Sequence, residues 1–120
     1  CHGILVYGGT KFRDEMRAFG ERKRIFKILR DSRRLLELAD DEVNILCATL
    51  KQKEPCDRFN DEHIIACAIL SKCNVIVTND KRADKYIKDQ DCKFYPHSNE
   101  RPKIYRYKAK HYKVFYGCCR

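Results

Sequence analysis

The sequence NDEHIIACAIL at residues 60–70, followed by VIVT at 75–78 and the pair Asn79-Asp80, decides the fold. After its acidic start, the first part is apolar on nearly every face, which predicts a buried helix with Asn60 or Asp61 as its N-cap. The second part is a β-branched run, typical of a strand inside a parallel sheet. Because only four residues separate the two, we expect a tight turn that reverses the chain.

The lengths of these two elements place Asp61 and Asp80 at the same edge of the predicted sheet. A helix rises about 1.5 Å per residue and a strand about 3.3 Å. About twelve helical residues and about five strand residues therefore cover similar distances, roughly 16–18 Å, in opposite directions. The carboxyl edge of parallel strands is where open α/β sheets bind ligands. We therefore expect the functional centre at this edge.

The rest of the chain alternates between short apolar strands and helices. A strand at 3–7 ends at Gly8-Gly9 and leads into a helix that begins at Thr10, carries Glu15 and stops near Gly20. Further helices are predicted at 21–31, 40–50 and 81–88, strands at 34–38 and 91–95, and loops at 52–59 and 96–102. This order predicts a single α/β domain with right-handed crossovers.

Three acids from distant parts of the chain, Glu15, Asp61 and Asp80, are expected to converge at the sheet edge. Clustered carboxylates raise each other's pKa, and a divalent cation relieves this repulsion. Oxygen ligands of this kind suit Mg²⁺ or Mn²⁺, which activate a bound water and stabilise charge on a phosphate. With a basic surface beside it, such a site predicts phosphodiester hydrolysis.

Each of these residues also has an ordinary explanation. Asp61 and Asp80 can each be a helix N-cap, and Glu15 can be a surface acid. We interpret His63 as a residue that packs or forms hydrogen bonds locally, not as a base. The prediction of a site therefore depends on the convergence of the three acids rather than on any one of them.

Positive charge is concentrated at the end of the chain. The 120 residues carry a formal net charge of +9. Seven of the 26 Lys and Arg residues and none of the 17 acids lie in 101–120, which leaves 19 cations against 17 acids in 1–100. We therefore divide the chain into an α/β core at 1–100 and a basic, aromatic-rich segment at 101–120. This segment favours a polyanionic partner, nucleic acid before membrane, with a solvated, disordered tail as the alternative.

The basic helix predicted at 21–31 has an apolar stripe of Ile25, Phe26, Ile28 and Leu29. Its outer charges are typical of a solvated helix face. No apolar run in the sequence approaches the about twenty residues that cross a bilayer.

The eight cysteines contain no Cys-x-x-Cys pair, and Cys47, Cys67 and Cys73 fall in or beside apolar elements, where a thiol behaves as a small hydrophobe. This pattern indicates a reducing, cytoplasmic compartment rather than a disulfide scaffold. The adjacent Cys118-Cys119 lacks nearby partners for a zinc site, and no role is assigned to this pair.

Several segments resemble the PIN domain nucleases. Residues 60–68 match the family pattern D-x-x-I-x-A-x-A, in which Asp61 opens a helix, and residues 75–80 match a strand that ends in T-x-D at Asp80. Residues 8–16 are similar to the segment that carries the family's helical glutamate, here Glu15. RPKIY at 101–105 resembles the ending of a prokaryotic subgroup, so the resemblance covers most of residues 3–105.

The resemblance implies a three-layer α/β/α fold with a small, mostly parallel central sheet, and a Mg²⁺- or Mn²⁺-dependent endoribonuclease. Three acids would be both catalytic residues and metal ligands: Glu15, Asp61 and Asp80. Three of their neighbours would shape the pocket: Asn60, Thr78 and Asn79. The cations expected to contact RNA are Lys11, Arg13, Lys81, Arg82, Arg101, Lys103, Arg106, Lys108, Lys110 and Lys113.

Many PIN nucleases are toxins of toxin–antitoxin pairs, so the resemblance also implies a cognate antitoxin or other regulatory protein as a partner besides RNA. A homodimer is a further expectation. PIN domains open with a strand that ends in Asp, whereas the first strand predicted here ends at Tyr7. Either that opening strand lies upstream of residue 1, or the site is weakened.

A weakened site leads to an alternative function, a catalytically impaired RNA-binding or regulatory module. Its basic aromatic segment would stack unpaired bases and hold phosphates. A phosphotransfer domain is the poorest interpretation, because Gly8-Gly9 alone does not make a phosphate loop.

Overall fold

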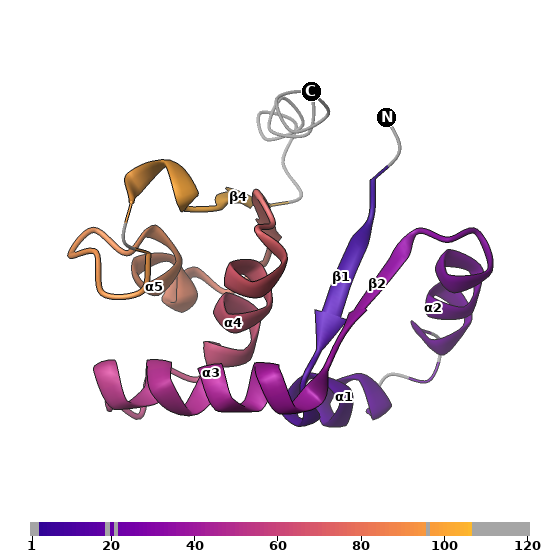
Figure 1. Cartoon of the computed structure of the whole chain (residues 1–120), viewed down its shortest axis with the longest axis horizontal. Helices are drawn as coiled ribbons and strands as arrows, with labels where there is room; N and C mark the ends of the chain where they lie inside the picture. Colours follow the sequence, from indigo (N-terminus) through magenta and orange to yellow (C-terminus); the bar gives the residue numbers. More distant parts are fainter. Residues whose placement is uncertain (1–2, 19, 21, 96, 107–120) are drawn as a thin grey trace.

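Two pairs of short parallel strands and a buried helix that touches both pairs form the centre of the structure (Figure 1). The computed structural model describes residues 3–18, 20, 22–95 and 97–106. Within them the chain is a mixture of helices and strands with small parallel sheets. At this level the predicted α/β class is confirmed.

The first half of the chain forms one strand pair and the helices around it. Its elements are β1 (Leu5–Gly8), α1 (Thr10–Arg17), α2 (Arg22–Asp31), β2 (Leu35–Leu38) and α3 (Asp40–Lys53). β1 and β2 are parallel, with Leu5 opposite Leu35 and Gly8 opposite Leu38. α1 and α2 form the long crossover connection that a parallel pair requires.

The second half forms the other strand pair. Its elements are α4 (Glu62–Ser71), β3 (Val75–Val77), the 3₁₀ turn η1 (Lys81–Ala83), α5 (Asp84–Lys88), the 3₁₀ turn η2 (Ser98–Glu100) and β4 (Lys103–Tyr105). β3 and β4 are parallel, with Ile76 opposite Ile104. Because β4 pairs with β3, the α/β core extends beyond residue 100, into the segment that the sequence analysis set apart as basic.

α4 is the buried helix that the sequence predicts. Ile65 and Ala66 are fully buried, and His63 and Cys67 are nearly so. The helix ends at Lys72, which has φ 54° and donates its N–H to carbonyls of the last turn. This left-handed residue makes the predicted tight reversal into β3.

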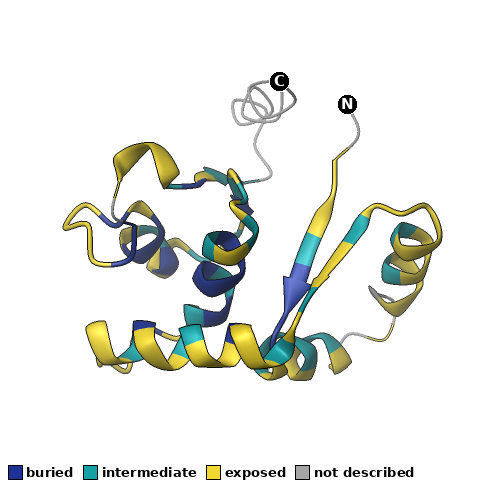
Figure 2. Ribbon diagram, in the orientation of Figure 1, coloured by how far each residue is buried: buried dark blue, intermediate teal, exposed yellow. Residues whose placement is uncertain are grey.

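The main core lies around Phe59, on the side of α4 that faces α3 and α5 (Figure 2). The Phe59 ring stacks on Phe94, with 5.1 Å between centroids, and tilts against Tyr86 at 4.7 Å. Val43 and Leu50 of α3 are buried in the same cluster. This packing holds the loop before α4 against α5 and so builds the walls of the pocket described below.

The predicted strand at 91–95 is wrong. The carboxylate of Asp89 is buried and accepts hydrogen bonds of 2.8–2.9 Å from the N–H groups of Lys93, Phe94 and Tyr95. Amides that bind a side chain cannot pair with a neighbouring strand, so the segment forms a turn.

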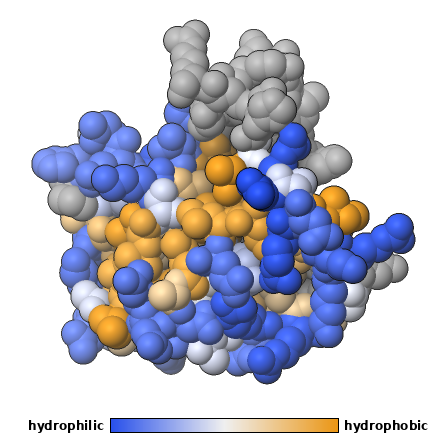
Figure 3. Space-filling view, turned by 45° about the vertical axis from the view of Figure 1, so that its right-hand side comes forward, coloured by the Kyte–Doolittle hydropathy of each residue, from blue (hydrophilic) through white to orange (hydrophobic). Residues whose placement is uncertain are grey.

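The single central sheet that the sequence predicts is also not formed among the described residues, where the two strand pairs remain separate sheets. The apolar stripe predicted for α2 is only half buried, since Ile25 and Ile28 are exposed. Ile4 and Val77, beside or within the strands, are more than 60% exposed. Figure 3 shows an apolar area across one face of the molecule, bordered by polar side chains.

The described cysteines are all free thiols: Cys47, Cys56, Cys67, Cys73 and Cys92. Within the part of the chain that the structure describes, no helix is both long and apolar enough to pass through a bilayer. Five residues singled out from the sequence lie outside the described residues: Lys108, Lys110, Lys113, Cys118 and Cys119.

Candidate functional site

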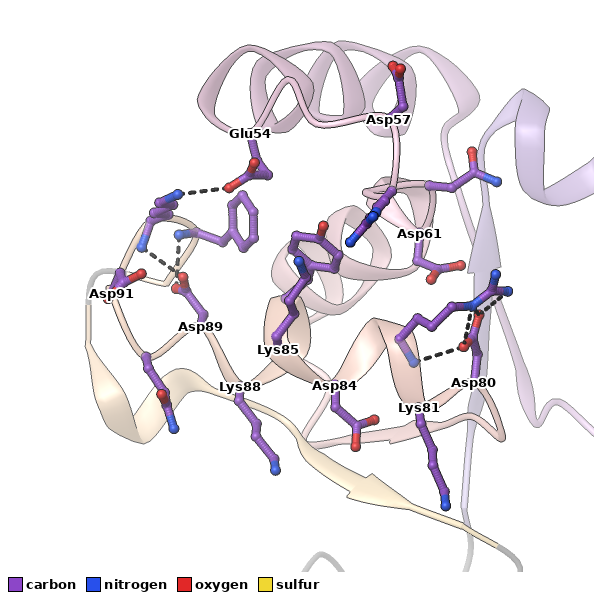
Figure 4. Close-up of a pocket in the computed structure, with 17 residues that line it drawn as sticks. Glu54, Asp57, Asp61, Asp80, Lys81, Asp84, Lys85, Lys88, Asp89 and Asp91 are labelled. Atoms are coloured by element: carbon purple, nitrogen blue, oxygen red, sulfur yellow. Dashed lines mark hydrogen bonds and ion pairs between the residues drawn. The ribbon is translucent and has the colours of Figure 1, made fainter.

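An open pocket of about 1020 Å³ lies beside the amino-terminal end of α4 (Figure 4). Its walls are the loop before α4 on one side and the η1–α5 segment on the other. Five residues selected from the sequence line it: Asn60, Asp61, Asp80, Lys81 and Arg82. The structure therefore brings Asp61 and Asp80 to one place, as the lengths of the helix and the strand predict.

Asp61 occupies the N-cap position of α4 but makes no capping hydrogen bond with its side chain. Burial raises the pKa of this carboxyl, and the neighbouring charges of Asp80 and Glu15 raise it further, against the lowering effect of His63 and Lys11. A half-buried carboxylate beside other acids is an unfavourable arrangement for folding alone. The capping explanation thus does not account for Asp61.

Asp80 has a structural role as well as a place in the pocket. Its carboxylate caps η1 by accepting the N–H of Arg82 at 2.9 Å, and it also binds the Arg82 guanidinium at 3.0 Å. The Arg82 side chain, followed by its backbone N–H, lowers the pKa of Asp80. The Thr78 hydroxyl accepts the N–H of Asp80 at 3.1 Å and so shapes the turn, while Asn79 is exposed.

Glu15 reaches α4 from α1 through a histidine. The Nε2 atom of His63 lies 3.0 Å from Oε2 of Glu15, and burial lowers the pKa of this imidazole, which favours the neutral form. In the tautomer protonated at Nε2, His63 donates to the carboxylate. Its Nδ1 atom is buried with no hydrogen-bond partner among the described residues. The sequence predicted local hydrogen bonding for His63 but not this partner, which is distant along the chain.

The three predicted acids are electrostatically coupled, because Asp80 and Glu15 both act on the pKa of Asp61. Nevertheless, no three His, Cys, Asp or Glu side chains of the described residues are close enough together to form a metal-binding group. Glu15 is held by His63, and Asp80 by Arg82. The carboxylate donors are those that Mg²⁺ and Mn²⁺ prefer, but their spacing in this conformation does not form a complete ligand set.

Two of the cations expected to contact RNA are instead engaged within the protein. The Lys11 ammonium binds the side chain of Asn60 at 2.8 Å and that of Glu62 at 2.9 Å, which ties α1 to the start of α4. The Arg13 guanidinium binds Glu37 and Asp40. Their charges are therefore largely neutralised by neighbouring carboxylates.

The remaining predicted cations differ in how far they are available. Arg106 forms an ion pair with Asp84, and Arg101 donates to the Cys92 sulfur at 2.8 Å. Lys103 is exposed on β4. Three lysines line the pocket without having been selected from the sequence: Lys85 and Lys88 in α5, and Lys93 in the turn after it. For Lys85 and Lys88, their spacing of three residues on one helical turn was the available signal.

Comparisons of the chain with models of protein families, with curated proteins and with solved structures find no match. The resemblance to PIN nucleases is therefore a hypothesis, and the structural feature that supports it is the pocket lined by Asp61 and Asp80.

Proposed function

We propose that the protein is a metal-dependent endoribonuclease of the PIN kind. The observation that carries this proposal is the state of Asp61, a half-buried carboxylate with no capping bond in an open pocket. Its pKa is raised by burial and by two acids from other elements. Uncompensated, perturbed carboxylates in a pocket are typical of sites that bind a ligand.

Asp61 and Asp80 are the pocket carboxylates that would hold Mg²⁺ or Mn²⁺, with Glu15 as the third acid. When bound, the ion would supply an activated water and stabilise negative charge on the phosphate. The cations around Asp61 and Asp80 would bind the substrate rather than the metal. Lys81 and Lys85 line the same pocket, where they would bind and orient the RNA backbone.

The arrangement of the strands supports the finer fold, a three-layer PIN-like domain. The backbone N–H and C=O groups of a strand alternate between its two edges. The N–H of Leu5 forms a hydrogen bond on the side of β1 that faces β2, and the N–H of Thr78 forms one on the side of β3 that faces β4. Each of β1 and β3 therefore has a second edge on the side away from its partner strand, and α4 contacts both strands. A further parallel strand between these edges would join the two pairs into one central sheet, as the resemblance implies.

The direct test is cleavage of a mixed RNA with Mn²⁺, with Mg²⁺ or with EDTA. We expect metal-dependent cutting that falls by at least about 100-fold in Asp61→Asn. Asp57→Asn is the matched control, because Asp57 lines the same pocket and loses the same charge. Equal activity in Asp61→Asn and the control would contradict the proposal. A version extended at its amino terminus tests whether a further strand completes the site.

One observation favours a second candidate, an RNA-binding module without catalysis. Glu15 and Asp80 already have partners in His63 and Arg82, and the described residues form no group of three metal ligands. In that case the chain binds RNA equally with EDTA and with metal, and removal of residues 107–120, which keeps β4, weakens binding. A cognate antitoxin or a second copy of the chain is the protein partner of either candidate.

A reducing compartment such as the cytoplasm fits both candidates. The described cysteines are free, and burial raises the pKa of Cys67 to about 11, so this thiol stays protonated at neutral pH. A protonated, buried thiol is chemically inert and packs as an apolar group.

A further inference from the structure

A second cavity, of about 370 Å³, lies between α1, α2 and β1. Its wall combines two aromatic rings, a methionine and five cations, with no acid among the described residues that line it. The cations are Arg13, Arg17, Lys23, Lys27 and Arg30. A volume of this size is in the range of sites for small ligands.

Side chains from one face of each helix form the wall of this cavity. On α1, these are Arg13, Met16 and Arg17, at spacings of three and four residues. On α2, the lining residues share one helix face and are Lys23, Phe26, Lys27 and Arg30. The charges of α2 on this face thus line a cavity instead of forming only a solvated surface.

Tyr7, at the base of the cavity, is held by contacts with three side chains of its wall. Tyr7 is buried, and its ring meets the Phe26 ring edge-on, with 4.9 Å between centroids. The Arg13 guanidinium lies 5.2 Å from the centre of the Tyr7 ring, and Arg30 donates to the Tyr7 hydroxyl at 3.3 Å. Phe26 is only half-buried, so part of its ring remains accessible from the cavity.

The cations of the wall are unequally compensated. Arg13 binds Glu37 and Asp40, and Arg17 binds Asp14. Lys23 and Lys27 are exposed and have no ion pair among the described residues. Uncompensated cations that line a concave surface attract anions.

We propose that this cavity is a nucleotide subsite for single-stranded RNA. Lys23 and Lys27 hold phosphate oxygens, and a base packs against Phe26 and Met16. The inference rests on the proposed action on RNA and adds a location for a stretch of the strand outside the acidic pocket.

The position of α1 connects the two places. Residues 11 and 15 face α4, through the contacts of Lys11 with Glu62 and of Glu15 with His63. Residues 13, 16 and 17 face the second cavity from the opposite side of the same helix. An RNA strand that passes over α1 can therefore occupy both places.

The test is equilibrium binding of a fluorescent oligouridine to the whole chain, measured by anisotropy at several salt concentrations. The test variant is Lys23→Gln with Lys27→Gln. We expect affinity to fall by about tenfold and the salt slope to fall by about 1.4, or about 0.7 for each lost phosphate contact. Phe26→Leu keeps an apolar side chain but removes the stacking surface, and should weaken binding by roughly fivefold.

The matched control is Lys53→Gln with Lys72→Gln, which removes the same charge from exposed positions that line neither cavity. Affinity within about twofold of the parent is expected for this pair. An equal loss in both double variants would overturn the subsite in favour of diffuse attraction. Displacement of the RNA by polyglutamate at equal charge concentration would overturn it in favour of an acidic protein ligand.

The failure of this subsite is distinguishable from failure of the proposed function. Binding of oligouridine is measured in EDTA, without the proposed metal site, whereas cutting is measured with Mn²⁺ or Mg²⁺, so each readout reports on one of the two proposals. If no variant cuts RNA but the Lys23 and Lys27 pair loses affinity, the subsite stands without the nuclease. If cutting depends on Asp61 while the lysine pair binds normally, the subsite is wrong and the nuclease stands.

Discussion

The Nε2 atom of His63 lies 3.0 Å from Oε2 of Glu15, a contact between residues 48 positions apart that joins α4 to α1. His63 is 1% exposed, whereas the Glu15 side chain is 53% exposed. The His63 ring also packs against the Phe12 ring in a T-shaped arrangement, with 5.9 Å between centroids. This imidazole therefore holds an exposed acid in a fixed place near Asp61.

His63→Ala is expected to destabilise the fold by about 2–4 kcal/mol, because it removes a buried ring and a hydrogen bond. Urea unfolding measures the change. Glu15→Gln is the control, since its amide oxygen can still accept from Nε2 and the side chain is largely exposed. A loss for Glu15→Gln as large as that for His63→Ala would show that the acid, not the ring, stabilises this contact.

Asp61→Asn is expected to stabilise the fold at neutral pH. The pKa of Asp61 is raised by burial and then by Asp80 and Glu15, so the folded protein holds this proton more tightly than the unfolded chain. The stabilising effect of the protonated form is complete below the unfolded pKa of about 3.9 and is lost as pH rises through the folded pKa. Above that pH, the melting temperature of the Asp61→Asn variant should be roughly 2–4 °C higher than that of the parent.

Thermal melting between acidic and neutral pH checks this prediction. Asp80→Asn is the matched control with the opposite sign, because Arg82 lowers the pKa of Asp80. Its ionised form contributes stability that is present above the unfolded pKa and lost as pH falls through the folded pKa. Stabilisation by both substitutions at neutral pH would contradict the electrostatic account of the pocket.

Gly9→Ala is expected to cost about 1–3 kcal/mol in the free energy of unfolding. Gly9 has φ 90°, and a Cβ there would lie 2.5 Å from Cγ1 of Val43. Chemical denaturation of both variants measures the effect against Gly3→Ala, whose Cβ would meet nothing within 4 Å. Equal stability of the two would mean that the turn between β1 and α1 adjusts freely.

The open strand edges predict self-association. β3 pairs only with β4 among the described residues, and Val77 in β3 is 65% exposed. Exposed apolar edge strands pair with other chains, and a lysine on the edge prevents this. We expect Val77→Lys to weaken association at least about tenfold in sedimentation velocity across a concentration series.

Ile45→Lys provides the comparison for that experiment, because Ile45 is 68% exposed on α3 and lies in neither strand pair. If this substitution disrupts association as strongly as Val77→Lys, the contact does not run through the strand edge. The expected homodimer would then use the helical face.

Local patterns were sufficient for the central helix and the strand that follows it. α4 and β3 come from runs that are apolar along their length, and such runs predict elements inside the fold, although Val77 at the end of β3 is 65% exposed. The position of Asp61 opposite Asp80 follows from helix and strand rise alone. α1, α2, β2 and α3 begin close to the predicted residues because capping residues and the spacing of apolar residues mark their starts.

The sequence by itself determined the order of helices and strands as far as α5, the buried helix α4, and the presence of Asp61 and Asp80 in one pocket. Only the tertiary structure decided that Asp89 captures the amides at 93–95, that His63 holds Glu15, and that β4 joins β3. The periodicity of apolar residues along the sequence indicates which side chains of a helix or strand face the core and which face solvent. Contacts between distant residues depend on how the finished elements pack, and that information is absent from any local run of sequence.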